Sequence, residues 1–126
     1  MIVLDTSVLI DALAGPQKSL PALQALIAGS RRILMPTLVL YEWLRGPREP
    51  EELDFQEGLL PATEAIPFGA EEAAVAAVIY RTVPRARARE ADIAIASHAL
   101  LRDASVWTLN RVDFEDVPGL DLYSAA

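Results

Sequence analysis

The sequence predicts an α/β domain in which helices cover both faces of a mostly parallel sheet of four to five strands. Short apolar segments alternate along the chain with longer segments of helical periodicity. Strands joined by helices run parallel, because the connecting helix returns the chain to the same edge of the sheet. The 126 residues, 52% of them hydrophobic, suffice for one core. We therefore expect a single domain over residues 1–126.

The first half of the chain predicts two strands and four helices. The strands are 1–5, which begins MIVL, and 32–35, which Pro36 closes. Thr6 and Thr37 are expected to cap the helices that follow these strands. Glycine and proline end several of these segments. The predicted helices cover 6–13, 18–29, 37–45 and 50–60.

The second half predicts two more strands and two long helices. A brief extended segment at 64–68 precedes an alanine-rich helix over 70–83. A basic loop at 84–89 leads into a further helix over 90–102. The strands are expected at 105–109 and 120–123.

Composition excludes several classes of site. The chain has no cysteine and one histidine, which rules out disulfides and makes zinc a poor candidate. It contains neither a phosphate-binding GxxxxGK[ST] loop nor a GxGxxG turn after a strand. No apolar run approaches the roughly 20 residues that span a bilayer, and no signal peptide is visible. We expect a cytoplasmic protein without a membrane partner.

The charge of the chain is unevenly distributed. The net charge of −7 argues against a generally basic surface for nucleic acid. Four arginines nevertheless fall within nine residues, at Arg81, Arg85, Arg87 and Arg89. They could contact phosphate groups of a ligand, or form a solvated loop paired with the acidic stretch 49–57. The sequence favours neither alternative.

Four acidic residues stand in or next to apolar segments: Asp5, Glu42, Asp92 and Asp113. Asp5 ends the first predicted strand, and Asp113 follows the strand at 105–109. Ligands of parallel α/β sheets bind at the carboxyl ends of the strands. Asp5 and Asp113 are therefore expected at the same edge.

Each acid also has an ordinary structural explanation. Asp5 could cap the first helix, and Asp113 could be a turn residue. Glu42 could form an ion pair with Arg45 one helical turn away. Asp92 lies in a first helical turn, where the helix dipole favours a carboxylate.

Convergence of these acids would require a counter-charge. Two carboxylates ~4 Å apart repel by about 4 kcal/mol at an effective dielectric constant of 20. A divalent cation with oxygen ligands removes this repulsion, and Mg²⁺ and Mn²⁺ both suit carboxylates. The acids therefore favour a metal site.

The acidic motifs resemble those of the PIN-domain nucleases, and among them the small VapC-type toxins of toxin–antitoxin pairs. Four segments carry the resemblance, in order and over nearly the whole chain. They are MIVLDTSVLIDAL with Asp5, LVLYEWLRG with Glu42, EADIAIASHAL with Asp92, and TLNRVDF with Asp113.

The resemblance implies a PIN-like three-layer α/β/α sandwich and a metal-dependent endoribonuclease. Asp5, Glu42, Asp92 and Asp113 would hold one or two Mg²⁺ or Mn²⁺ ions, which activate a water to hydrolyse RNA phosphodiester bonds. Thr6 and Asn110 would support these ligands by hydrogen bonds. A cognate antitoxin and a homodimer are also implied. A housekeeping RNA-processing nuclease, or a PIN module that binds RNA or protein without cleaving, remains an alternative.

Overall fold

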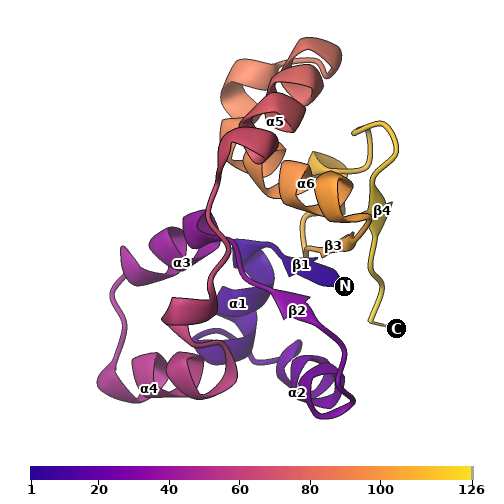
Figure 1. The fold of residues 1–126 in the computed structure, drawn as a ribbon. Coiled ribbons are helices and arrows are strands. Elements are labelled where there is room, and N and C mark those ends of the chain that lie inside the picture. The colour runs from indigo at the N-terminus through magenta and orange to yellow at the C-terminus, as the bar shows by residue number, and fades with distance from the viewer. Residues whose placement is uncertain (126) are drawn as a thin grey trace.

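The chain folds into a three-layer α/β/α sandwich around a parallel sheet. The computed structural model describes residues 1–125 (Figure 1). The four strands lie in the order β2-β1-β3-β4, and every pairing is parallel. Their bounds are Ile2–Leu4 for β1, Ile33–Leu34 for β2, Ser105–Trp107 for β3 and Asp121–Leu122 for β4. The predicted fold class is confirmed.

β1 is the central strand, and its register determines what lies at the carboxyl edge. All three of its residues are buried, because it pairs with β2 on one side and β3 on the other. Leu4 pairs with Trp107, so both strands end at the same level. The next residues, Asp5 and Thr108, therefore leave the sheet side by side.

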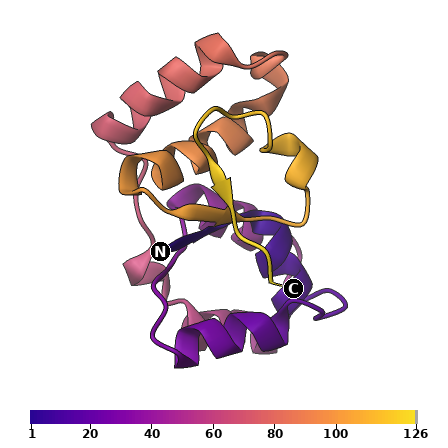
Figure 2. The same ribbon diagram turned by 90° about the vertical axis from the view of Figure 1, so that its right-hand side faces the viewer.

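Helices cover both faces of the sheet. One layer contains α1, α2 and α4, and the other contains α5 and α6 (Figure 2). α3 contacts both α1 and α6 and so connects the two layers. The helices are Thr6–Leu13 (α1), Leu20–Ala28 (α2), Thr37–Leu44 (α3), Pro50–Leu59 (α4), Ala70–Thr82 (α5) and Glu90–Arg102 (α6). Short 3-10 segments cover Ala62–Glu64 (η1), Ala86–Arg89 (η2) and Arg111–Asp113 (η3).

The predicted helix starts at residues 6 and 37 agree with the structure, but the expected capping roles of Thr6 and Thr37 are wrong. The residues that precede α1 and α3 are Asp5 and Pro36, and neither makes a side-chain capping bond. Thr6 and Thr37 are the first helical residues instead. This frees the Thr6 hydroxyl for a tertiary contact.

Two irregular segments also differ in detail from the sequence prediction. The predicted loop 84–89 ends in η2, and the predicted strand 105–109 stops at Trp107. In the segment 64–68, Ile66 forms a single parallel bridge with Pro36. That bridge ties the chain before α5 to the start of α3.

The core lies between the sheet and both helical layers. It includes β1, the inner faces of α1 and α6, and the large side chains of Trp43 and Phe114. Over residues 1–125, no helix combines the length and the hydropathy needed to cross a membrane.

Candidate functional site

A cavity of about 370 Å³ opens at the carboxyl edge of the sheet and is lined by three of the four acids predicted from the sequence. Asp5 reaches it from the end of β1, Glu42 from α3 and Asp92 from α6. Asn110 contributes from the loop after β3. The remaining lining residues are Thr6, Ser7, Ile10 and Arg45.

Asp5 is buried and held by two hydroxyl groups. Its Oδ2 atom accepts hydrogen bonds from Ser7 Oγ at 2.8 Å and from Thr108 Oγ1 at 2.7 Å. Asp5 makes no capping bond to α1, so capping does not explain why a carboxylate stands here. Both bonds go to the same oxygen, which fixes the side chain and leaves Oδ1 free of them.

The sequence analysis missed Ser7 and Thr108. Ser7 Oγ accepts a bond from the Leu109 amide at 3.0 Å, and Thr108 Oγ1 accepts one from the Asn110 amide at 2.9 Å. The two hydroxyls therefore connect Asp5 to the loop after β3. The available signal was the position of Ser7 two residues after Asp5, and of Thr108 near the end of the predicted strand 105–109, whose carboxyl end was expected at the same edge as Asp5.

In the metal-dependent nuclease that the sequence resemblance implies, replacing Thr108 by valine is expected to lower RNA cleavage about 10- to 100-fold, because loss of a group that orients a metal ligand typically has that effect. Valine keeps the shape but cannot donate to Asp5. The measurement is kcat/KM on a fixed RNA. Thr82→Val is the matched control, since Thr82 donates only to the Val78 carbonyl on α5. Equal activity of both variants would show that Thr108 does not support the site.

Glu42 is held between two helices. Its Oε1 accepts a hydrogen bond from Thr6 Oγ1 at 2.6 Å, across from α1. Its Oε2 lies 3.6 Å from Arg45 Nη2, the ion pair that the helical spacing allowed. The Glu42 side chain is 19% exposed and the Arg45 side chain 57%. The sequence-predicted support by Thr6 thus acts on Glu42.

Asp92 lies in the first turn of α6, and the charges of the other acids act on its carboxyl group. Burial, followed by the charges of Asp5, Asp113 and Glu42, raises the pKa of Asp92 to about 6. The carboxylates are thus close enough to repel one another. This repulsion is the electrostatic condition that a bound cation relieves.

Asp113 stands apart from the other three acids. It is exposed in η3 and does not line the cavity, although its charge acts on Asp92. Its backbone amide donates to the Asn110 carbonyl at 3.0 Å, within a turn. The structure therefore places Asp113 beside the cavity and Asn110 in its wall.

The candidate ligand atoms are of the kind that a hard divalent cation prefers. All candidate ligands are carboxylates, and no cysteine is present to favour a softer ion. In this arrangement no three His, Asp or Glu side chains of residues 1–125 surround a common point. Asp5 and Glu42 instead point oxygens at Ser7, Thr108, Thr6 and Arg45. Shared coordination of one ion therefore requires side-chain rotation.

Arg89 is engaged within the protein, unlike the other arginines of its cluster. Its side chain is 11% exposed and donates to both Asp116 carboxylate oxygens and to the carbonyl oxygens of Pro84 and Asp113. The hydrogen bonds with Asp116 raise the pKa of Arg89, and Arg89 lowers the pKa of Asp116. Arg89 thus ties the start of α6 to the loop that carries Asp113.

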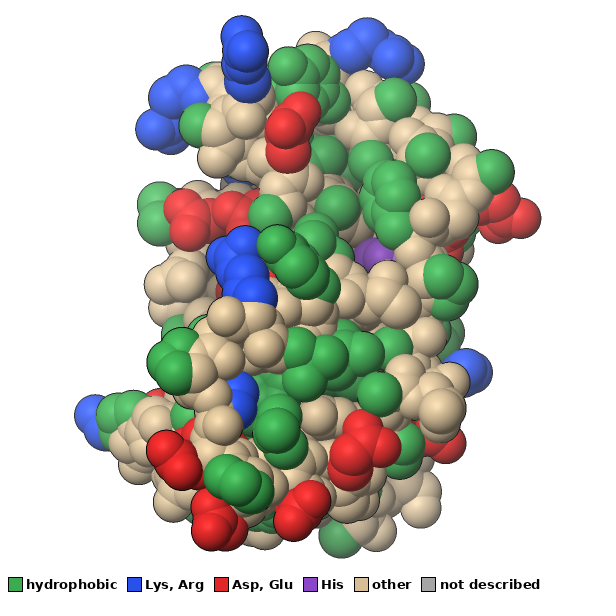
Figure 3. All heavy atoms as spheres, turned by 90° about the vertical axis from the view of Figure 1, so that its left-hand side faces the viewer, with side chains coloured by type: hydrophobic (Ala, Val, Ile, Leu, Met, Phe, Trp, Pro, Cys, Tyr) green, Lys and Arg blue, Asp and Glu red, His purple; other side chains and the backbone are tan. Residues whose placement is uncertain are grey.

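Arg81, Arg85 and Arg87 are exposed. Figure 3 shows basic side chains at the top of one face, where α5 ends, and acidic side chains at its bottom, where α4 lies. The two charged stretches are at opposite ends of the molecule. Pairing between the arginine cluster and the stretch 49–57 is therefore wrong for this structure.

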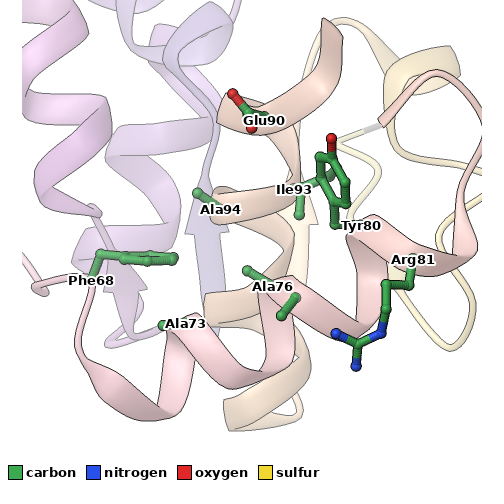
Figure 4. Close-up of a pocket in the computed structure, with 9 residues that line it drawn as sticks. Phe68, Ala73, Ala76, Tyr80, Arg81, Glu90, Ile93 and Ala94 are labelled. Carbon is green, nitrogen blue, oxygen red and sulfur yellow. The ribbon is translucent and has the colours of Figure 1, made fainter. Parts of the chain in front are cut away.

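A larger, mostly apolar cavity lies elsewhere. It measures about 450 Å³ between α5 and α6 and includes Phe68, Tyr80, Ile93 and several alanines (Figure 4). It belongs to a broad hydrophobic band across the face in Figure 3. Glu90 and Arg81 are the charged residues in its lining, whereas three of the predicted acids line the smaller cavity.

Comparison with known proteins agrees with this geometry. Three solved structures share the fold over nearly their whole length. DNA-bound VapBC from Salmonella typhimurium matches with a TM-score of 0.78 and 23% identity over 99% of this chain and 98% of that chain. VapBC2 from Rickettsia felis, bound to a promoter DNA fragment, matches with a TM-score of 0.74 and 23% identity over 98% of both chains. FitAcB from Neisseria gonorrhoeae matches with a TM-score of 0.73 and 19% identity over 99% of this chain and 98% of that chain.

Among curated proteins, none matches the sequence. A family model does match: it is described as the PIN domain, and it covers residues 2–120. These residues include every element from β1 to η3 and all four predicted acids. The chain belongs to the PIN domain family.

Proposed function

We propose that the protein is an endoribonuclease dependent on Mg²⁺ or Mn²⁺ that acts as a VapC-type toxin. The observation that carries this proposal is the cavity at the carboxyl edge, in which Asp5, Glu42 and Asp92 meet. Their mutual repulsion, seen in the raised pKa of Asp92, is relieved by a divalent cation. Family membership and the four ordered motifs support the same chemistry.

Each residue of the cavity has a specific part in the proposed reaction. Asp5, Glu42 and Asp92 would hold one or two ions, with Asp113 acting from beside them. Ser7 and Thr108 fix Asp5, and Thr6 fixes Glu42. The ion, when bound, would lower the pKa of a water and offset charge on the phosphate. Asn110 provides an amide in the wall next to the reacting phosphate.

The exposed arginines are proposed to guide RNA to this acidic cavity. Arg81, Arg85 and Arg87 are free to contact phosphates at the end of α5. We do not assign this part to Arg89, because it is bound to Asp116.

A cognate antitoxin, a homodimer and a cytoplasmic location complete the proposal. The similar structures VapBC, VapBC2 and FitAcB support a partner protein for this fold. The band of exposed hydrophobic side chains in Figure 3 offers surface for such an assembly.

Metal removal tests the reaction directly. Purified protein is expected to cleave structured RNA with added Mg²⁺ or Mn²⁺ and to lose this activity in excess EDTA. Products are resolved on a denaturing gel, and Asp5→Asn protein from the same preparation is the control. The readout is the rate of loss of full-length RNA.

The possible outcomes separate the alternatives. Equal cleavage in metal, in EDTA and by Asp5→Asn protein would exclude a metal nuclease at this site. Binding without cleavage would indicate a PIN module that recognises RNA. Cleavage without growth inhibition on expression in a bacterium would favour a housekeeping processing enzyme over a toxin.

A further inference from the structure

Arg45 is the one basic side chain in the lining of the acidic cavity as residues 1–125 form it. It follows α3 directly and shares the cavity wall with Asp5, Glu42 and Asp92. Its guanidinium lies 5.4 Å from the centre of the Tyr41 ring and 3.6 Å from Glu42. A cation in this position can do more than pair with a neighbouring acid.

The contact with Glu42 is weak enough to be exchanged. Arg45 is 57% exposed, and the 3.6 Å separation between Nη2 and Oε2 is too long for a good hydrogen bond. Exposed ion pairs of this kind contribute little to stability. Glu42 Oε1 keeps its 2.6 Å bond from Thr6, so the carboxylate stays in place when Arg45 leaves.

The substrate supplies a better partner for Arg45. A phosphodiester entering this cavity meets several carboxylates, which repel its charge. A guanidinium donates two parallel N–H bonds to a phosphate, and this geometry suits it better than a single long contact. The Tyr41 ring supports the guanidinium by a cation–π contact and limits where it can move.

We propose that Arg45 binds the phosphate of the RNA substrate within the acidic cavity, and that its contact with Glu42 is the resting position of this side chain. This inference rests on the proposed nuclease function. It makes Arg45 a residue that touches the substrate, whereas Arg81, Arg85 and Arg87 contact RNA outside the cavity.

The test compares Arg45→Ala and Arg45→Lys with Arg32→Ala. Arg32 is also exposed, but it precedes β2, at the opposite edge of the parallel sheet. With a 5′-fluorescent single-stranded RNA and Mn²⁺, Arg45→Ala is expected to lose about 10- to 100-fold in kcat/KM. The kcat/KM of Arg45→Lys should lie between those of Arg45→Ala and wild type, because lysine keeps the charge but cannot donate two parallel hydrogen bonds. Arg32→Ala should match wild type.

Two further measurements distinguish phosphate binding by Arg45 from a purely structural role. Millimolar guanidinium ion should restore part of the activity of Arg45→Ala, while equal concentrations of sodium or urea should not. The Mn²⁺ affinity of Arg45→Ala, measured by electron paramagnetic resonance, should equal or exceed that of wild type, because Glu42 is released. A fall in Mn²⁺ affinity that accounts for the whole loss of kcat/KM would overturn the inference.

Binding measurements keep this inference separate from the proposed function. Fluorescence anisotropy of the same RNA should show weaker binding by Arg45→Ala than by Arg32→Ala, even if wild type binds without cleaving. In that case the nuclease proposal fails while the phosphate contact stands. Arg45→Ala with wild-type kcat/KM and wild-type RNA affinity would contradict the phosphate contact.

Discussion

Asp92→Asn is expected to lose RNA cleavage by more than about 100-fold, which exceeds the effect typical of losing a group that only orients a ligand. The same variant should be more stable than wild type without metal at pH 7–8. Cleavage is expected to fall because the variant lacks a carboxylate that would hold the ion. Stability is expected to rise because burial, and then the charges of Asp5, Asp113 and Glu42, disfavour the ionised Asp92 carboxylate. An asparagine keeps the shape and removes the charge.

The pH dependence of this stability gain has a definite sign. The folded-state pKa of Asp92 is raised to about 6, from an ordinary value of 3.8. Between these values the folded state binds more protons than the unfolded state, so the stability of wild type falls as pH rises. The advantage of Asp92→Asn should therefore be absent near pH 3.5, grow through this window and be complete above pH of about 6.

Urea unfolding in EDTA at several pH values measures this gain, and kcat/KM with Mn²⁺ measures the loss. Asp54→Asn is the control, because Asp54 is exposed on α4. A variant that is inactive and also less stable at pH 8 would show that Asp92 acts in packing and not as a repelled carboxylate.

Glu72→Ala is expected to lower the free energy of unfolding by about 2–4 kcal/mol, since it leaves a partly buried cation without its partner. Glu72 Oε2 accepts from Arg102 Nη2 at 2.8 Å, and Oε1 accepts from the Gly69 amide at 3.1 Å. The Glu72 side chain is 8% exposed and Arg102 is 25% exposed. Loss of the carboxylate therefore removes both the hydrogen bond at the start of α5 and the ion pair that attaches α5 to α6.

His98 completes this cluster. It is 1% exposed, with Nδ1 3.7 Å from Glu72 Oε2, and it packs edge-on against Phe68. Burial lowers the pKa of His98, and the charge of Arg102 lowers it further. Its burial and its contact with Phe68 make His98 a packing residue of this cluster.

The effect of Glu72 on stability should depend on pH in the opposite sense to that of Asp92. The hydrogen bond from Arg102 lowers the pKa of Glu72 below its usual value of 4.5. Its stabilisation is therefore complete above about pH 4.5 and disappears as pH falls through the lowered pKa. Urea unfolding at pH 7 and at pH 3 measures this difference. Glu71→Ala, at an exposed neighbour, should change stability by less than about 0.5 kcal/mol.

Cleavage provides a second check on Glu72. The cluster lies outside the acidic cavity, so folded Glu72→Ala protein should keep the kcat/KM of wild type. If fully folded Glu72→Ala protein lost cleavage, the α5–α6 contact would instead be shown to support the site.

The sequence predicts most of the elements because they are locally encoded. β1 and β3 are apolar runs with turn signals at their ends, and α5 is rich in alanine. The candidate carboxylates were found because a charge inside an apolar segment is itself a local anomaly. The parallel topology predicted a shared edge for Asp5 and Asp113 alone, and the family resemblance added Glu42 and Asp92. In the structure Asp5, Glu42 and Asp92 line the cavity, and Asp113 does not.

Other features depend on contacts that no local pattern reveals. The bonds from Ser7 and Thr108 to Asp5 need the register in which Leu4 pairs with Trp107. The engagement of Arg89 depends on the path of the loop that carries Asp116. In both cases a short polar side chain could equally have faced solvent, and only the tertiary arrangement selects its partner.

The central position of β1 also determines when the proposed site can form during synthesis. β1 is translated before β3, and α6 lies between them in the sequence. Asp5 and Thr108, whose hydroxyl fixes it, are 103 positions apart. Such non-local closure is slow compared with helix formation. Fragments that end before α6 and β3 have neither Asp92 nor Thr108, so the proposed cleavage centre forms only after β3 has been translated.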